Sequence, residues 1–370
     1  MRITRLEVFS FPVPFKVVFR HASASRSKAD NLIVAVQSDC GKVGYGEGCP
    51  RSYVTGETVE TGRAFIGKHR DEICGAVASA QDLRAWIDSH RTEIDDNPSA
   101  FCAVEIAILD LLGKVTGCST EEVLDSAPLE GAFQYSAILG DAPFLAYRWQ
   151  LGRYWRRGFR DFKIKVSGDL QRDRRKISAL KRKADPALRI RVDANNLWTS
   201  AEACSRHIAD LGYRIFAVEE PLQPRDLDGF RLVSENCSAK IILDESVTRR
   251  DDLVGLEDPE RWIVNIRVSK MGGVIRSLDI AQRAMQAGIG IVVGAQVGET
   301  SILTRSALTV MNAARPSLVG SEGAFGTHLL KEDLASPCLM FGSGGNIDTD
   351  KLNLREKPGQ GLEIRDDLLV

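Results

Sequence analysis

The sequence lacks an excess of charge of either sign. Lys and Arg together number 49 and Asp and Glu number 50, so the formal net charge is −1. A chain without a basic excess has no global electrostatic attraction for nucleic acid or an anionic membrane. Long apolar runs are also missing: the most apolar stretch, residues 287–295, is far shorter than a membrane span, and the first residues contain no apolar signal segment. We therefore expect a cytoplasmic protein without nucleic-acid or membrane partners.

Several common motifs are missing as well. None of the eight cysteines is spaced as CxxC, which argues against a zinc ribbon or a redox pair. We interpret Cys40, Cys102 and Cys204, which lie among apolar or turn residues, as reduced packing thiols. The glycine-rich segments GKVGYGEG and FGSGGN match neither a dinucleotide-binding fingerprint nor a P-loop, and we interpret them as turns. Two arginine-rich stretches are interrupted by acidic residues and are expected to be solvated helix faces.

What the sequence does contain is two regions with different patterns. Residues 1–130 are expected to form a small α+β domain, with strands at 3–11 and 31–38, a hairpin return that ends near residue 48, and helices over 55–69 and 100–117. From residue 131 onward, short apolar runs alternate with helical stretches. Eight strand candidates occur there, at residues 133–139, 162–166, 190–194, 215–220, 240–245, 262–268, 288–295 and 317–322.

This alternation predicts an α/β fold. Strands that alternate with helices form parallel sheets, and eight such units are typical of a (β/α)8 TIM-type barrel. We predict that residues 131–344 form the barrel. Residues 1–130 form an α+β capping domain, which a C-terminal segment at about 345–370 completes.

Polar residues lie at the ends of five successive strands of this predicted barrel. Their spacing is 25 to 28 residues, which corresponds to one βα unit and places each residue at the carboxyl end of its strand, where barrel active sites are built. The residues are Lys163 and Lys165 in FKIKV, Asp193 in IRVDANN, Glu219 in AVEEP, Asp244 in ILDES and Lys270 in IRVSKMGG.

The residue types point to one kind of chemistry. Three converging carboxylates repel one another unless a cation binds them, and a hard divalent ion such as Mg²⁺, with Mn²⁺ as a substitute, prefers oxygen ligands. Lys163 and Lys165 share one strand face because side chains alternate, and Lys270 lies across the mouth. Such a site suits removal of a proton α to a carboxylate. The metal and Lys163 would stabilise the enediolate, and Lys165 or Lys270 would act as the base.

The same motifs resemble a known family. KIK, DANN, VEEP, DES and NIRVSKMGG are similar to those of the enolase superfamily, in particular the muconate lactonizing enzyme (muconate cycloisomerase) subgroup, over nearly the whole chain. The resemblance implies that Asp193, Glu219 and Asp244 bind the metal and that Lys165 and Lys270 form the acid/base pair. The seventh strand lacks the His of the mandelate racemase subgroup.

The resemblance implies an isomerase that acts on a small carboxylate. We expect a muconate cycloisomerase-like enzyme or a racemase/epimerase of an acyl amino acid, and an o-succinylbenzoate synthase-like dehydratase is the alternative within the subgroup. Dipeptide epimerases of the subgroup carry Asp-x-Asp at the eighth strand, where this chain has GSEGAFG, so that activity is disfavoured. From another class, a Schiff-base lyase could use Lys165 or Lys270 as nucleophile, but it leaves the three carboxylates unexplained.

The residues that contact the substrate are expected in two places. In relatives, loops of the capping domain close over the mouth, which implies roles for residues near 19–28 and 51–55. On the barrel, the ends of the third, seventh and eighth strand units point to the same cavity. The candidates are Arg20, His21, Arg51, Tyr53, Asn195, Glu299 and Glu322. We also expect a homo-oligomer.

Overall fold

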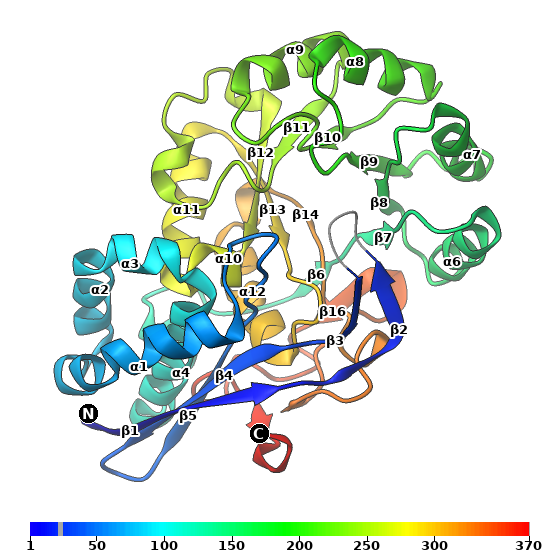
Figure 1. The fold of residues 1–370 in the computed structure, drawn as a ribbon. Coiled ribbons are helices and arrows are strands. Elements are labelled where there is room, and N and C mark those ends of the chain that lie inside the picture. The colour runs from blue at the N-terminus through cyan, green and yellow to red at the C-terminus, as the bar shows by residue number, and fades with distance from the viewer. Residues whose placement is uncertain (21–24, 370) are drawn as a thin grey trace.

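The structure is a computed structural model that describes residues 1–20 and 25–369, without the side chains of residues 18–26. Its N-terminal part is an antiparallel sheet against which helices pack (Figure 1). The sheet has the order β1-β4-β5, with β1 (Ile3–Phe11), β4 (Asn31–Ser38) and β5 (Val43–Gly48), and β2 (Pro14–Arg20) pairs separately with β3 (Ser25–Lys28). The helices are α1 (Val59–Ala76), α2 (Ala80–Ser89), α3 (Arg91–Asp96), α4 (Pro98–Thr116) and α5 (Thr120–Val123).

The predicted elements of this part are confirmed, but one interpretation is wrong. Helix α4 begins after Asn97 with a proline in its first turn and ends at Gly117, whose φ of 78° suits glycine. Gly44, Gly46 and Gly48, which we expected in turns, lie in strand β5. They share one face of the strand, against α4, and a Cβ on any of them would come within 1.9–2.2 Å of a carbonyl oxygen of that helix. Glycine here allows a close approach of strand and helix.

Residues 131–344, all of them described, contain a parallel sheet of eight strands, as predicted. The order is β14-β13-β12-β11-β10-β9-β8-β7, and the sheet curls so that its edges meet where the Ser136 amide donates to the Ser321 carbonyl at 2.8 Å. The strands are β7 (Ala137–Leu139), β8 (Asp161–Lys165), β9 (Arg189–Asp193), β10 (Ala217–Glu219), β11 (Lys240–Leu243), β12 (Trp262–Arg267), β13 (Gly290–Gly294) and β14 (Leu318–Ser321).

Helices follow the strands around the outside of the sheet (Figure 1). They are α6 (Phe144–Arg156), α7 (Leu170–Lys181), α8 (Ala201–Asp210), α9 (Leu227–Cys237), α10 (Val268–Met271), α11 (Val274–Ala287) and α12 (Ser301–Ala313). Short 3₁₀ turns are η1 (Arg250–Leu253), η2 (Pro259–Arg261), η3 (Arg315–Ser317), η4 (Gly326–His328), η5 (Ser343–Gly345) and η6 (Asp366–Leu368). This is the (β/α)8 architecture with an N-terminal capping domain.

The C-terminal segment contacts both parts of the molecule. Strand β16 (Asn346–Asp348) pairs with β6 (Ala132–Gln134), and β15 (Ala335–Ser336) pairs with β17 (Glu363–Ile364). Further along, the Gly359 amide donates to the Cys118 carbonyl at 2.8 Å, and the Gln360 amide donates to Asp110 of α4 at 2.9 Å. The tail therefore reaches the capping domain, and the exact domain boundaries stay a prediction.

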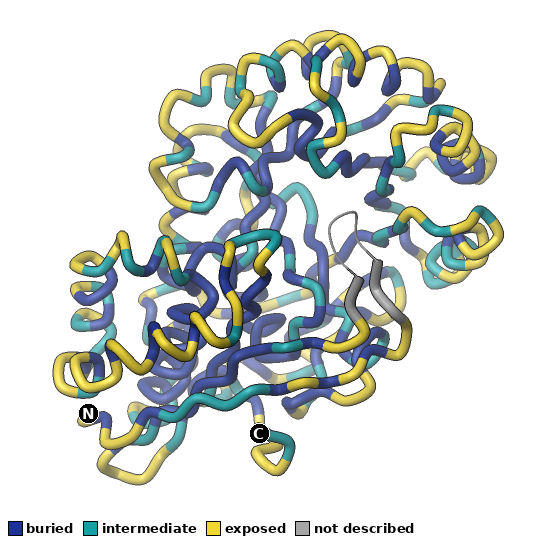
Figure 2. The backbone as a smooth tube through the Cα atoms, viewed as in Figure 1, coloured by how far each residue is buried: buried dark blue, intermediate teal, exposed yellow. Residues whose placement is uncertain are grey.

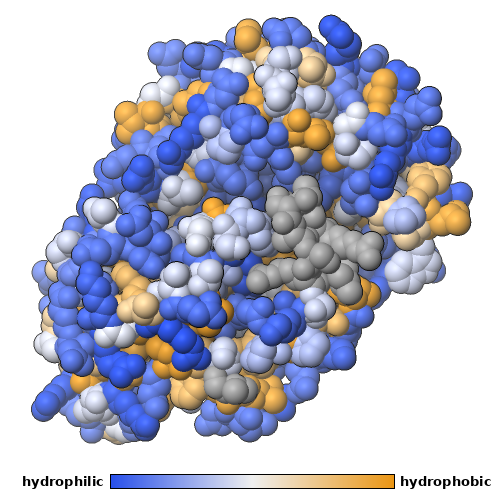
Figure 3. Space-filling model, viewed as in Figure 1, coloured by the Kyte–Doolittle hydropathy of each residue, from blue (hydrophilic) through white to orange (hydrophobic). Residues whose placement is uncertain are grey.

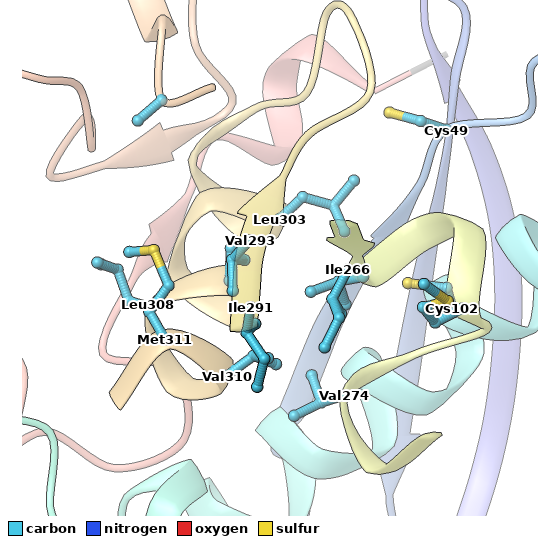
Figure 4. Packing of buried hydrophobic residues seen from close by; sticks show 14 of the residues in the cluster. Cys49, Cys102, Ile266, Val274, Ile291, Val293, Leu303, Leu308, Val310 and Met311 are labelled. Carbon is cyan, nitrogen blue, oxygen red and sulfur yellow. The ribbon is translucent and has the colours of Figure 1, made fainter. Parts of the chain in front are cut away.

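The two parts share one apolar core. Buried residues run from β4 and α4 through the barrel strands to α12, and Figure 2 shows these segments in dark blue. In Figure 4, Leu308 and Met311 of α12 lie beside Ile291 and Val293 of β13, and Cys102 of α4 faces the region of Ile266. This packing joins the capping domain directly to β12 and β13, the strands that come after the predicted metal ligands in the sequence.

The surface and the thiols add two findings. No helix among the described residues is long and apolar enough to cross a membrane, and the face in Figure 3 is largely hydrophilic with small separate apolar patches. Cys102 and Cys204 are buried free thiols, as expected. Cys40 is exposed in the turn between β4 and β5, so its interpretation as a packing thiol is wrong.

Candidate active site

The polar residues predicted at the strand ends meet at the carboxyl end of the barrel. Asp193 ends β9 and Glu219 ends β10, and the two residues are register partners on adjacent parallel strands. Lys165 ends β8 and is the register partner of Asp193. Because parallel strands in register bring equivalent positions side by side, these three residues form one continuous row at the ends of the adjacent strands β8, β9 and β10.

Lys163 lies at the centre of a buried group of carboxylates. Its Nζ is 2.7 Å from Glu219 Oε2, 3.0 Å from Glu322 Oε2 and 3.4 Å from Asp193 Oδ2. Burial opposes the charge of Lys163, but Glu219, Glu322 and Asp193 outweigh burial and raise its pKa. Lys163 is thus a permanent cation, suited to electrostatic stabilisation and unsuited to proton abstraction.

Lys165 has more access to the barrel mouth than Lys163. Its Nζ donates to Asn195 Oδ1 at 2.9 Å and lies 3.4 Å from Asp193 Oδ2, and its side chain is 13% exposed. Asn195 adopts a left-handed conformation with φ of 46°, which asparagine tolerates better than most residues. The turn after β9 therefore brings the Asn195 amide next to the lysine.

Asp244 belongs to a second ion-paired group. Its Oδ1 is 2.8 Å from Lys270 Nζ, and its Oδ2 accepts from Arg267. Lys270 has no exposed side-chain surface and also donates to the carbonyls of Val247 and Asn265, both at 3.1 Å. Burial, helped by the nearby Arg267, lowers the pKa of Lys270 to about 7. Lys270 is therefore much closer to a neutral base than Lys163.

The three predicted metal ligands do not all converge as expected. Among the described residues, their oxygens do not form a group within 4.8 Å of one another. Lys163 pairs with Asp193 and Glu219, while Lys270 and Arg267 pair with Asp244. The donor set nevertheless fits a hard divalent ion. All the donors are carboxylates, and two of them, Asp193 and Glu219, are register partners on adjacent strands.

Glu220 holds the segment that carries Asp244. Its Oε1 accepts from the amides of Asp244 at 2.7 Å and Ser246 at 2.8 Å, and its Oε2 accepts from the Ser246 hydroxyl at 2.8 Å. Glu220 has φ of 40°, an unusual conformation for a residue other than glycine, and burial raises its pKa to about 7. The strained backbone after β10 directs the Glu220 side chain toward the end of the next strand, β11.

The predicted substrate-binding residues fall into different settings. Glu322 is buried and paired with Lys163 and with Arg191 Nη1 at 3.0 Å, which together lower its pKa against the effect of burial. Glu299 is partly buried, accepts from the Gln296 amide, and burial raises its pKa to about 8. Asn195 contacts Lys165 as described above.

The capping-loop residues also differ from one another. Arg51 is fully buried and bridges the two parts of the chain, donating to Asn31 Oδ1 at 2.9 Å and to the Val297 carbonyl at 2.7 Å. This position argues against the expected substrate contact and favours a structural role. Tyr53 is partly exposed, and its role stays a prediction. The side chain of Arg20 and all of His21 lie outside the described residues.

Several residues of the site were missed at the level of sequence. They are Arg191, which pairs with Glu322, Arg267, which pairs with Asp244, and Asn265, whose Nδ2 donates to Glu219 Oε1 at 3.3 Å. The sequence did contain a signal for these residues, because side chains two positions apart in a strand lie on the same face. Arg191 precedes Asp193 by two residues, and Asn265 precedes Arg267 by two, so each pair shares one strand face.

Fold and site together define a class: a barrel enzyme whose strand ends carry carboxylates and lysines for acid/base chemistry. Comparisons with known proteins refine this class. Residues 146–368 match the family model described as "Enolase C-terminal domain-like", and the chain belongs to the enolase superfamily. It is an isomerase of that superfamily, as the sequence predicted.

Individual relatives are similar over most of the chain. The N-succinyl-L-Arg/Lys racemase of Bacillus cereus is 26% identical and covers 100% of this chain and 97% of its own. The hydrophobic dipeptide epimerase of Enterococcus faecalis is 29% identical over 82% of this chain and 84% of its own. A crystal structure of the dipeptide epimerase from Enterococcus faecalis, complexed with Mg and L-Leu-L-Tyr, has a TM-score of 0.82 at 26% identity, covering 98% and 100% of the two chains.

Proposed function

We propose that this isomerase is a Mg²⁺-dependent racemase or epimerase of N-acyl amino acids. The observation that carries the proposal is the presence of two lysines in different surroundings at one barrel mouth. Lys165 ends β8 beside Asp193, and Lys270 follows β12 beside Asp244. The similarity to an N-succinyl amino acid racemase over the whole chain supports the same reaction class.

Mg²⁺ held by Asp193, Glu219 and Asp244 would supply Lewis-acid stabilisation of the substrate carboxylate. Lys163, a permanent cation among these carboxylates, adds a fixed positive charge where negative charge develops. Lys165 and Lys270 exchange the α-proton with the substrate, one lysine on each face. The lowered pKa of Lys270 suits it to accept a proton near neutral pH.

The eighth strand favours an acylated substrate over a dipeptide. A dipeptide carries a free ammonium group that needs an anionic partner, and this chain lacks Asp-x-Asp at that position. Its one carboxylate there, Glu322, is already paired with Lys163 and Arg191. An N-acyl amino acid has no such ammonium group and therefore does not need Glu322 as an anionic partner.

The test is incorporation of solvent deuterium at the α-carbon. The protein with Mg²⁺ is incubated in D₂O with both enantiomers of a panel of N-succinyl and N-acetyl amino acids and, separately, with dipeptides, and exchange is followed by NMR. We expect exchange and inversion with acylated substrates. Exchange confined to dipeptides would refute the substrate class, and exchange with none of these compounds would refute the reaction.

A further inference from the structure

A second cluster of ligating side chains lies in the capping domain, away from the barrel mouth. His69 and Glu72 are three residues apart on α1 and share a helix face, and His90 lies at the end of α2. Glu72 Oε2 is 3.5 Å from His69 Nδ1, and Glu72 Oε1 is 3.2 Å from His90 Nε2. One ligand atom from each of the three residues lies within 4.8 Å of the other two.

The contacts of His90 orient its ring toward Glu72. His90 Nδ1 lies 3.0 Å from the Trp86 carbonyl and 3.0 Å from the Ser89 hydroxyl. Its Nε2 faces the Glu72 carboxylate. A ring nitrogen beside a backbone carbonyl, with the other nitrogen free to bind a metal, is the usual arrangement of metal-ligating histidine.

The surroundings of the cluster are pre-organised. His69 is 4% exposed, and in the described part of the chain its Nε2 has no hydrogen-bond partner. Trp86 stacks on His90 with ring centroids 3.9 Å apart and meets His69 edge-on. These aromatic contacts fix both imidazoles. Glu72, half exposed, leaves a path from solvent.

We propose that His69, Glu72 and His90 bind a divalent transition-metal ion such as Zn²⁺. Two imidazoles and one carboxylate form a borderline-soft donor set that suits Zn²⁺, with a water completing four-coordination, whereas the all-carboxylate set in the barrel suits Mg²⁺. The ion would connect α1 to the junction of α2 and α3, and so would stabilise the folded capping domain.

The experiment uses the full chain, stripped with a chelator and then kept in excess Mg²⁺ so that the barrel carboxylates are occupied. Zn²⁺ binding is measured by calorimetry, and Co²⁺ is used as a spectroscopic probe of the ligands. The variants are Glu72→Gln and His90→Asn. The control Glu93→Gln alters a neighbouring exposed carboxylate that is 3.9 Å from Lys68 and outside the cluster. Asp244→Asn tests independence from the barrel.

We expect the wild type to bind one Zn²⁺ under these conditions and to gain thermal stability. Affinity should fall at least tenfold in Glu72→Gln and in His90→Asn and stay unchanged in Glu93→Gln and Asp244→Asn. The Co²⁺ spectrum should lack a thiolate charge-transfer band, since Co²⁺ bound at the exposed Cys40 would produce one. No Zn²⁺ binding by the wild type, wild-type Zn²⁺ affinity in the two cluster variants, or a thiolate band would overturn the proposal.

Discussion

Replacing Glu220 with alanine should disable the barrel site without touching any proposed metal ligand or catalytic lysine. The Glu220 carboxylate accepts three hydrogen bonds of 2.7–2.8 Å from the segment that carries Asp244. Alanine would leave the buried amides of Asp244 and Ser246 without acceptors, because neither residue has appreciable exposed surface. The segment would then lose its fixed position relative to Glu219.

The magnitude follows from these contacts. Each buried amide without an acceptor costs about 1–3 kcal/mol, so two of them predict a loss of roughly 2–6 kcal/mol in the free energy of unfolding. Groups that orient metal ligands typically change metal affinity by about 10- to 100-fold. We therefore expect Glu220→Ala to be destabilised and to bind Mg²⁺ at least tenfold more weakly than the wild type.

The assays are urea denaturation and calorimetric Mg²⁺ titration, with Glu220→Gln as the matched control. Glutamine keeps a carbonyl oxygen that can accept from both amides, so the control should stay within a few-fold of the wild type in Mg²⁺ affinity. If Glu220→Ala binds Mg²⁺ as tightly as the wild type while folded, the segment does not depend on this carboxylate and the reasoning is refuted.

Three further predictions address the lysines, the pH dependence of stability and the domain junction. Lys270→Ala should abolish racemisation yet retain α-proton exchange for the one enantiomer that Lys165 reaches, and Lys165→Ala should show the opposite preference. Wild-type exchange of both enantiomers in either variant would exclude two bases. Asp173, whose pKa is lowered to about 2 by His207 and Lys176 against the effect of burial, stabilises the fold above about pH 4. That stability is lost as the pH falls toward 2, so urea midpoints of Asp173→Asn should change less over this range than those of the wild type. Arg305→Met should lose about 3–5 kcal/mol of unfolding free energy by leaving Glu121 as an unpaired buried charge. The double variant with Glu121→Leu should recover part of it, and identical urea midpoints for single and double variants would contradict this account.

The barrel could be predicted from sequence because its signal is periodic. Each strand is a short apolar run, each is followed by a helix, and the polar residues from Lys165 to Lys270 recur with the length of one unit. Strand β12, for example, is buried up to its last residue, Arg267, and only Asn265 interrupts its apolar run. Periodicity of this kind needs no knowledge of which distant residues touch.

Pairing between distant residues was not predictable in this way. Glu322 and Arg191 are 131 positions apart, and the ion pair between them depends on closure of the barrel between β7 and β14. Arg51 is a similar case. We expected it in a loop that contacts the substrate, but it donates to Asn31 and to the carbonyl of Val297 in the loop after β13. Likewise, whether Gly46 belongs to a turn or allows a strand to pack closely against a helix cannot be decided until the neighbouring helix is known.

The same long-range contacts explain why the capping domain belongs to the catalytic architecture. Glu47 of β5 accepts from the amides of Thr300 at 2.9 Å and Leu303 at 3.2 Å, at the first turn of α12. Glu105 of α4 accepts from the amides of Val274 and Ile275, at the first turn of α11. A carboxylate at a helix N-terminus satisfies free amides and interacts favourably with the helix dipole.

These two carboxylates act on the helices that follow β12 and β13. Gly273 precedes α11 with φ of 115°, and a Cβ there would lie 2.3 Å from Glu105 Oε2, so the glycine pair after Lys270 is what lets the capping-domain carboxylate reach the helix. Burial raises the pKa of Glu105 to about 7 and that of Glu47 to about 7, and the hydrogen bonds from these amides oppose that rise. Since α11 begins four residues after Lys270, these hydrogen bonds connect the capping domain to the segment that carries a proposed catalytic base.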